Sequence, residues 1–527
     1  MAGKTQGLGA KAAGTIYPLF VGSAIGVLLA AFKIIIATRL LGPALFGIYV
    51  FVVSYYTLIG SINDFGISSY FKKRVAELNY KKDGRGMQRT LSAGFALGAA
   101  VSLTLALVGI FFSGYAAAVF GSSVGATQNL LEIGSLVLFT TIMFAIVSNV
   151  LIGLGHGKNY SVSYLTYMAI DFSITVYALL NGYGVIGILI GTLVGGVAGI
   201  FIALFYINKS LSYMDFCPWY PKMPDIKEIF DFSYPLAAYN FFAGSMQNFS
   251  VIFLGFFVSG TVIGNYGTAL KGLFVLSVFY GSVVTVLLPT FSEAAKRNLG
   301  KAYNEGVFNS SLVYAVFVTF PVLLYFAVFS KPLIYLFVGV AYSLAPLYLT
   351  LMALGTVLSI LGFLSGSMLI ARGYTRKILK YGALSSLLQL FSIIMLVKYL
   401  GFGVIGAIAS IFFVGSLANS IFFVFAVSRI LKMRINMGKL ARMFSANLAF
   451  LLSMAAVTYL IGSLGVEIIA GAALLVILYP AIVMLFGAMN LDEVAYFKRS
   501  TESLVFAGPL IAMVCEYMTA VGKRVSY

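Results

Sequence analysis

Apolar runs of about 20 residues follow one another along almost the whole chain, and they leave it few ways to fold. A helix of that length crosses the hydrocarbon core of a bilayer, where backbone N–H and C=O groups must find partners within the protein. Only 9% of the 527 residues are charged, against roughly 25% in soluble globular proteins. The sequence therefore predicts an all-α protein that crosses a membrane many times.

The individual spans are located by their length and flanking residues, because lipid-facing helices are apolar on most sides and periodicity discriminates poorly. About fourteen transmembrane helices are expected on this basis. They cover residues 15–38, 45–70, 91–113, 131–154, 161–181, 184–207, 232–258, 265–290, 308–330, 344–370, 378–399, 402–428, 443–463 and 466–490.

The basic residues test this count. With the N-terminus placed in the cytoplasm, 29 of the 34 lysines and arginines lie in the termini, in the even-numbered loops or in the first turn after such a loop, and only Arg39, Lys331 and Lys398 lie in odd-numbered loops. This bias is what the positive-inside rule describes. We therefore expect a multi-pass protein of the cell membrane with both termini in the cytoplasm. Because the net charge of +18 is spread over short loops, membrane lipids are expected partners and nucleic acid is not.

Residue types that serve catalysis or bind metals are scarce. Cys217 and Cys515 lie far apart and His156 is the only histidine, so we expect neither a metal site nor a histidine-based catalytic triad. The chain has no P-loop motif, and its loops are too short for a soluble catalytic domain. We therefore expect a protein that is not an enzyme, with no catalytic residue and no cofactor.

An internal repeat divides the chain. Five features recur in the same order at spacings of 217 to 219 residues, and each alone would be weak because glycine and tyrosine are common here. The pairs are Tyr17 and Tyr234, Gly42 and Gly260, Gly47 and Gly264, Gly155 and Gly373, and NGYGVIGILIG (181–191) with LGFGVIGAIAS (400–410).

Each repeat holds six helices, an even number, so the two copies have the same orientation in the membrane. Parallel halves of this kind are typical of alternating-access transporters. We expect helices 1–6 and 7–12 to form two lobes around a central cavity, followed by helices 13 and 14. The expected domains are 1–210, a cytoplasmic linker at 211–231, 232–430, 431–490 and an amphipathic cytoplasmic tail at 491–527.

Several stretches resemble a known family. RLLGPALFGIYVFVVSYYTLIGSINDFGISSYFKKRVAE (39–77) is similar to the opening signature of prokaryotic polysaccharide flippases, which belong to the multidrug/oligosaccharidyl-lipid/polysaccharide exporter superfamily. GHGKNY (155–160), GYGVIG (182–187), LLPTFSEAAKR (287–297) and LDEVAYFKRS (491–500) are similar too. The resemblance implies alternating-access movement of an oligosaccharide linked to a polyprenyl phosphate or diphosphate, from the cytoplasmic to the outer leaflet. It also implies a cationic lumen, and a polysaccharide polymerase and glycosyltransferases as partners.

Four charged side chains lie inside expected spans and away from their ends, namely Lys33, Asp64, Asp171 and Lys271. Each costs roughly 3 kcal/mol or more if it faces lipid at the bilayer centre, so we expect each to face a cavity or a partner. Two lysines across a cavity would suit a phosphate, which needs charge more than a fixed geometry. Pairing or snorkelling remains an alternative for the lysines, and a structural role remains one for the aspartates. Three of these charges share a helical stripe with small or polar residues: Gly22, Gly26 and Lys33; Ser61, Asp64 and Ser68; Gly264, Thr268 and Lys271.

The fifth helix carries the most informative face, with Tyr160, Tyr164, Tyr167 and Asp171 at i, i+4, i+7 and i+11. Aromatic rings stack on sugars and carboxylates accept sugar hydroxyls, although tyrosines also collect at membrane interfaces. Arg39 suits an interfacial anchor or a contact at the mouth of the lumen. The candidate substrate-binding residues are Lys33, Lys271, Arg39, Asp64, Asp171, Tyr164, Tyr167, Asn240 and Gln247.

Two other functions remain in view. A cation-coupled multidrug exporter of the same superfamily would share the repeat, but it would normally have twelve helices and acidic groups for cationic drugs. A membrane glycosyltransferase would need a catalytic carboxylate or histidine beside a substantial loop. If transport is coupled to H⁺ or Na⁺, Asp64 or Asp171 is the expected site.

Overall fold

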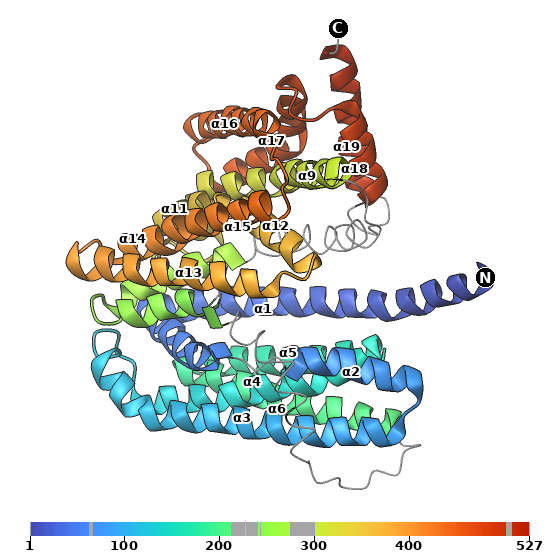
Figure 1. The fold of residues 1–527 in the computed structure, drawn as a ribbon. Helices are drawn as coiled ribbons and strands as arrows, with labels where there is room; N and C mark the ends of the chain where they lie inside the picture. Colours follow the sequence, from blue (N-terminus) through green and yellow to red (C-terminus); the bar gives the residue numbers. More distant parts are fainter. Residues whose placement is uncertain are drawn as a thin grey trace. The chain divides into compact units, whose positions relative to one another are not determined.

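The computed structural model describes residues 2–62, 67–211, 227, 241–242, 244–274, 301–501 and 508–525, and all regular structure in these residues is helical (Figure 1). The helices are α1 (Ala2–Ile59), a 3₁₀ turn (Gly60–Ile62), α2 (Ile67–Lys81), α3 (Gly84–Val119), α4 (Gln128–Gly153), α5 (Gly157–Leu180), α6 (Gly184–Ser210), α9 (Lys301–Val328), α10 (Ser330–Phe337), α11 (Ala345–Val357), α12 (Ile360–Ala371), α13 (Thr375–Ile393), a π-helix (Ile394–Tyr399), α14 (Gly403–Ile408), a second π-helix (Ala409–Gly415), α15 (Ser416–Ile430), α16 (Met437–Leu460), α17 (Leu464–Leu485), α18 (Leu491–Thr501) and α19 (Gly508–Val525).

Ten of the described helices are long and apolar enough to cross a membrane, and the pair α11 and α12, bent by 47°, makes an eleventh if it is one span. α1 covers the first predicted span and the first part of the second, and its backbone breaks between them at Gly42 (φ 68°). The predicted spans 232–258 and 265–290 lie partly outside the described residues. Every other predicted span corresponds to a helix or to this bent pair, which confirms the all-α membrane fold.

The second predicted span, 45–70, is too long. α1 ends at Ile59, and α2 begins as a separate helix at Ile67. Ser61 lies in the 3₁₀ turn between them, where its hydroxyl donates to the carbonyl of Leu58 at 2.6 Å and competes with regular helical bonding. Ser61 and Ser68 therefore do not share one helical stripe, and the apolar sequence hid this helix end.

By its packing the chain divides into two compact units, Met1–Gly264 and Asn265–Tyr527. In the first unit, α3, α4, α5 and α6 lie side by side (Figure 1). Close backbone contact requires glycine at two of the repeat positions. Gly47 and Gly264 bring their backbones together with no room for a Cβ on either side. A Cβ on Gly260 would likewise lie 2.7 Å from the carbonyl oxygen of Val124.

Two described contacts of the first unit agree with the predicted order of spans. Phe120, in the third predicted loop, contacts Phe256, near the end of the seventh predicted span, with ring centroids 4.3 Å apart. His156 hydrogen-bonds Ser210 at 2.9 Å, which joins the fourth and sixth loops. An even-numbered loop thus meets another even-numbered loop, as the predicted topology requires.

The tight contact of α5 with α6 depends on a stripe of glycines. Gly187, Gly191, Gly195 and Gly199 recur every four residues on α6, and each lies against α5. A Cβ at Gly195 would lie 2.7 Å from the carbonyl oxygen of Tyr167. Small residues at such spacing let membrane helices approach until their backbones are in contact.

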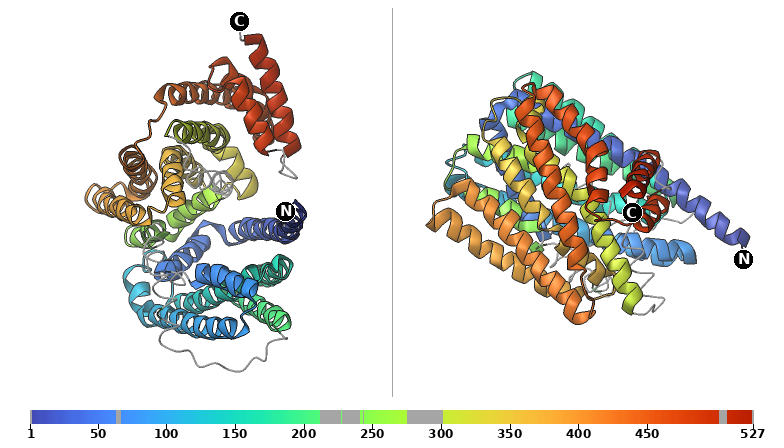
Figure 2. Two further views of the ribbon diagram at one scale, coloured as in Figure 1. Left: turned by 45° about the vertical axis from the view of Figure 1, so that its right-hand side comes forward. Right: turned by 90° about the horizontal axis from the view of Figure 1, so that it is seen from above.

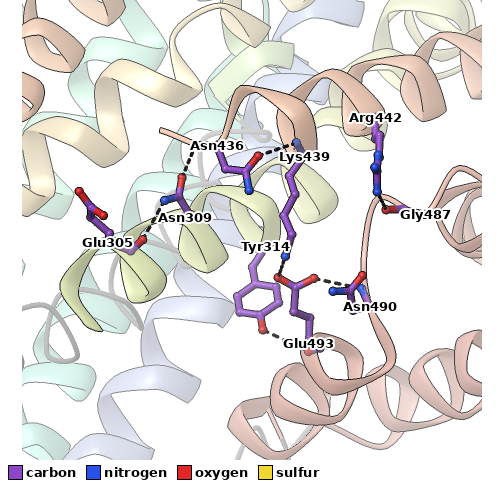
Figure 3. A network of polar contacts seen from close by, with 9 residues as sticks. All are labelled: Glu305, Asn309, Tyr314, Asn436, Lys439, Arg442, Gly487, Asn490 and Glu493. Atoms are coloured by element: carbon purple, nitrogen blue, oxygen red, sulfur yellow. Dashed lines mark hydrogen bonds and ion pairs between the residues drawn. The ribbon is translucent and has the colours of Figure 1, made fainter. Parts of the chain in front are cut away.

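In the second unit a polar network fastens the tail to the last spans (Figure 3). Lys439 of α16 forms an ion pair with Glu493 of α18 at 2.6 Å, and the hydroxyl of Tyr314 in α9 donates to the Glu493 carbonyl at 3.1 Å. α18 and α19 run crosswise to α16 and α17 (Figures 1 and 2). This arrangement fits a tail that lies outside the membrane-crossing bundle.

Replacing Gly195 by alanine tests the glycine stripe. The new methyl group would force α5 and α6 apart, because its neighbours are the Tyr167 carbonyl oxygen and the backbone nitrogen and Cβ of Asp171, which cannot move aside. We expect Gly195→Ala to lower the free energy of unfolding in detergent by about 2 kcal/mol. Gly306→Ala is the matched control, since Gly306 is exposed on α9 with open space around the position of a Cβ. Equal stability of the two variants would contradict this account.

Candidate functional site

The site begins with the contact between α1 and α5, which run parallel. A Cβ on Gly22 would meet Ser161, and one on Gly26 would meet the ring of Tyr164. Ser161 also donates to the carbonyl of Pro18 at 2.7 Å. The predicted stripe of Gly22, Gly26 and Lys33 is therefore the surface of α1 that packs against α5.

Lys33 and Asp171 meet at the far end of this contact. The Nζ atom of Lys33 donates to Oδ2 of Asp171 at 2.5 Å, and the two side chains are 11% and 3% exposed. Taking either charge out of water alone is expensive, so each side chain makes the other tolerable inside the bundle. Of the four charges predicted within spans, these two form a pair.

The second oxygen of Asp171 is also engaged. Its Oδ1 lies 3.3 Å from the hydroxyl of Thr175, one turn along α5, and 3.1 Å from the hydroxyl of Thr192 on α6. The glycine stripe makes the second contact feasible, because a Cβ on Gly191 would stand 2.6 Å from the Thr175 hydroxyl. The carboxylate thus has a cationic partner on one oxygen and two hydroxyls near the other, of which that of Thr192 also lies 3.0 Å from the carbonyl of Ile188 in α6.

The tyrosines of α5 form the continuous face that their spacing predicts. Tyr160 and Tyr164 stack with ring centroids 6.1 Å apart, and Phe144 of α4 contacts Tyr167 edge-on at 5.1 Å. Tyr167 is buried, while Tyr160 and Tyr164 keep part of their surface exposed. Only the part of this face toward the start of α5 is therefore accessible in this conformation.

Of the other predicted site residues, the structure describes Arg39, Gln247 and Lys271. Arg39 is exposed on α1 beyond Lys33, and Gln247 is exposed in the helical residues 244–254. Lys271 is half-buried in the second unit, in the helical residues 260–274. Asp64 and Asn240 lie outside the described residues. Substrate contact by any of these residues stays a prediction.

Sequence reasoning missed the residues that support Asp171. Thr175 follows it by one helical turn, a signal available in the sequence, but Thr192 comes into reach only through the fold of α6 against α5. Within the described residues, no group of three or more His, Cys, Asp or Glu side chains could hold a metal ion. The arrangement places the Lys33 ammonium and the Asp171 carboxylate side by side within the bundle. The ammonium can bind an anion, and the carboxylate can bind a cation.

A model of the family described as "Polysaccharide biosynthesis protein" matches residues 36–346, which is more than half of the 527 residues. The chain belongs to this polysaccharide biosynthesis family. The match confirms the resemblance drawn from the glycine and basic motifs. A comparison with curated protein sequences found no match.

Solved structures extend the likeness of this family member to transporters. The lipid II flippase MurJ, in an inward closed conformation, matches with a TM-score of 0.70 and 17% identity over 88% of this chain and 98% of its own. An inward-facing multidrug resistance MATE family transporter of the MOP superfamily matches with a TM-score of 0.63 and 16% identity, over 79% of this chain and 98% of its own. A MOP superfamily transporter from Pyrococcus furiosus, reported with a binding pocket of reverse polarity, matches with a TM-score of 0.50 and 17% identity, over 80% of this chain and 95% of its own. At these identities the likeness establishes the fold.

Replacing Thr192 by valine tests the support of Asp171. The variant keeps the shape of the side chain but removes a hydroxyl whose single hydrogen is shared between the Asp171 carboxylate at 3.1 Å and the Ile188 carbonyl at 3.0 Å. A hydrogen bond to a charged group is worth about 1.5 kcal/mol or more. We expect a loss of that size in the free energy of unfolding, measured in detergent. Thr166→Val is the control, because the Thr166 hydroxyl donates only to the carbonyl of Val162 within α5 at 2.9 Å. Equal losses in the two variants would show that Asp171 gains nothing from Thr192.

Proposed function

We propose that this protein is a flippase that moves an oligosaccharide linked to a polyprenyl phosphate or diphosphate from the cytoplasmic to the outer leaflet by alternating access. The family supports a role in polysaccharide biosynthesis, and the fold is one that transporters share. The product would serve assembly of a cell-surface polysaccharide. The protein acts in the cell membrane, with both termini in the cytoplasm, as the distribution of basic residues favours.

The observation that carries this proposal is the ammonium of Lys33 inside a membrane-crossing helix. An intramembrane charge is costly and by default marks a functional site. A lysine held by a single carboxylate can bind a phosphate of the carrier as a point charge. Lys271, from the second repeat, would supply a second cation to the same anion, and Arg39 would contact it nearer the membrane surface.

The sugar part of the substrate needs aromatic and polar surfaces. Tyr160 and Tyr164 present stacked rings with exposed surface at the start of α5, where a pyranose ring can stack on them. Tyr167 and Asp171 would join the contact only in a conformation that separates α1 from α5. Asp64, Asn240 and Gln247 would provide further partners for sugar hydroxyls. A polysaccharide polymerase and glycosyltransferases that act on the same carrier are the proposed partner enzymes.

A cation-coupled drug exporter is the second candidate. It is favoured by the likeness to a MATE family transporter and by the buried carboxylate of Asp171, which would suit a cationic drug or a coupling ion. The Lys33 ammonium bound to that carboxylate argues against a drug exporter, because it would repel a cationic substrate.

Transport in proteoliposomes tests the proposal. We expect wild-type protein to move a fluorescent polyprenyl-diphosphate oligosaccharide across the bilayer, and Lys33→Ala/Lys271→Ala to reduce the initial rate by about a hundredfold, since each lost contact to the anion is worth more than 1 kcal/mol. The double variant removes both charges proposed to hold the phosphate. The rate of quenching of the outer-leaflet fluorophore is the readout.

Arg372→Ala is the control for the general loss of a cation, because Arg372 lies at the end of α12 outside the proposed site. A double variant that folds and moves the lipid at the wild-type rate would return both lysines to structural roles. Saturable uptake of a cationic dye, with no movement of the lipid, would overturn the flippase proposal in favour of the exporter.

A further inference from the structure

Both oxygens of the Asp171 carboxylate are engaged in this structure. Lys33 binds Oδ2, and the hydroxyls of Thr175 and Thr192 lie within hydrogen-bond distance of Oδ1. The side chain is 3% exposed. A proton or a metal cation arriving at this carboxylate would have to displace the ammonium first. Lys33 thus already supplies the positive charge that a coupling ion from solution would bring.

Two threonine hydroxyls lie near the carboxylate in addition to Lys33. They come from α5 and α6, so they remain near Asp171 whether or not α1 moves. The Thr192 hydroxyl also lies 3.0 Å from the carbonyl of Ile188, so its hydrogen can turn to the carboxylate or to α6. Asp171 therefore keeps polar neighbours when Lys33 departs, and these offset part of the cost of its unpaired charge.

A break in the helix separates the part of α1 that carries Lys33 from the rest of α1. This first part packs closely against α5 at Gly22 and Gly26, and the Ser161 hydroxyl of α5 donates to the carbonyl of Pro18. Beyond Lys33 the helix breaks at Gly42, where φ is 68° and open space surrounds the position of a Cβ. Such a break lets the first part of α1 shift without carrying the second part with it.

The second repeat shows the same position without a charge. The repeat spacing of 218 residues places Gln389 at the position of Asp171. Packing agrees with this assignment, because Gly191 lies against the backbone oxygen of Asp171, and its repeat partner Ser410 donates to the backbone oxygen of Gln389 at 2.8 Å.

Lys33 has no cationic counterpart either. The repeat spacing places Ser250 or Val251 at its position, and neither carries a charge. At these equivalent positions the charged pair belongs to the first repeat alone. An exchange of ionic partners at this position is therefore possible in the first repeat and not at the equivalent position of the second.

We propose that Lys33 is a tethered cation, which neutralises Asp171 between transport cycles and transfers to the phosphate of the lipid carrier when substrate binds. The site then needs no coupling cation from solution. This proposal rests on the proposed function, because it requires an anionic substrate. A diphosphate carries more charge than one carboxylate, so the ammonium exchanges one partner for another and is never left bare in the membrane.

The test measures initial flipping rates in proteoliposomes against the mole fraction of the fluorescent polyprenyl-diphosphate oligosaccharide, with and without imposed Na⁺ and pH gradients. We expect wild-type rates to change by less than about twofold under either gradient. Asp171→Asn should lower the half-saturating fraction by about tenfold, because Lys33 is no longer held by a charge, and should also lower the maximal rate. Gln389→Ala is the matched control and should keep both values within about twofold.

A wild-type rate that rises steeply with either gradient overturns the proposal, and this result needs no variant to fold. An Asp171→Asn protein with unchanged half-saturation and a lost response to the gradient would instead make Asp171 a site of ion coupling. In both cases the flippase function would stand. If wild-type protein moves none of the lipid, the proposed function fails and the tethered cation fails with it.

Discussion

A lysine and an aspartate that meet between two membrane-crossing helices govern much of this structure. Neither Lys33 nor Asp171 is tolerable there alone, so the pair constrains how α1, α5 and α6 come together. α1 must approach α5 closely enough for contact at 2.5 Å, which the glycines at 22 and 26 allow. The ion pair therefore depends on the small residues that let α1 and α5 approach each other.

The same logic extends to α6. Its glycines bring the backbone against α5, and this approach places the Thr192 hydroxyl 3.1 Å from the carboxylate. In the second repeat, Ser410 takes the place of a glycine and a π-helix spans Ala409–Gly415. A π-helix accommodates an extra residue and often marks a functional position. At the equivalent positions, only the first repeat carries the charged pair.

Much of the fold could be predicted from the sequence, because the length of an apolar run and the bias of basic loops follow from the bilayer itself. The repeat was visible for a related reason, since glycines such as Gly47 and Gly264 are needed wherever backbones touch. The end of the second span was missed, because Ile59 and Ile67 belong to one apolar run although the helix stops between them. The pairing of Lys33 with Asp171 was one of two open alternatives, since 138 residues separate them and only the fold selects between a partner and a cavity.

The stability of the ion pair is the most direct test of this account. Free energies of unfolding in detergent would be compared for wild type, Lys33→Met, Asp171→Ala and the double variant. Removing one member leaves the other charge buried alone, so we expect each single variant to lose at least about 3 kcal/mol and the double variant to recover most of that loss. Losses that add to within about 0.5 kcal/mol would mean that the two side chains are not coupled, and the central claim would be contradicted.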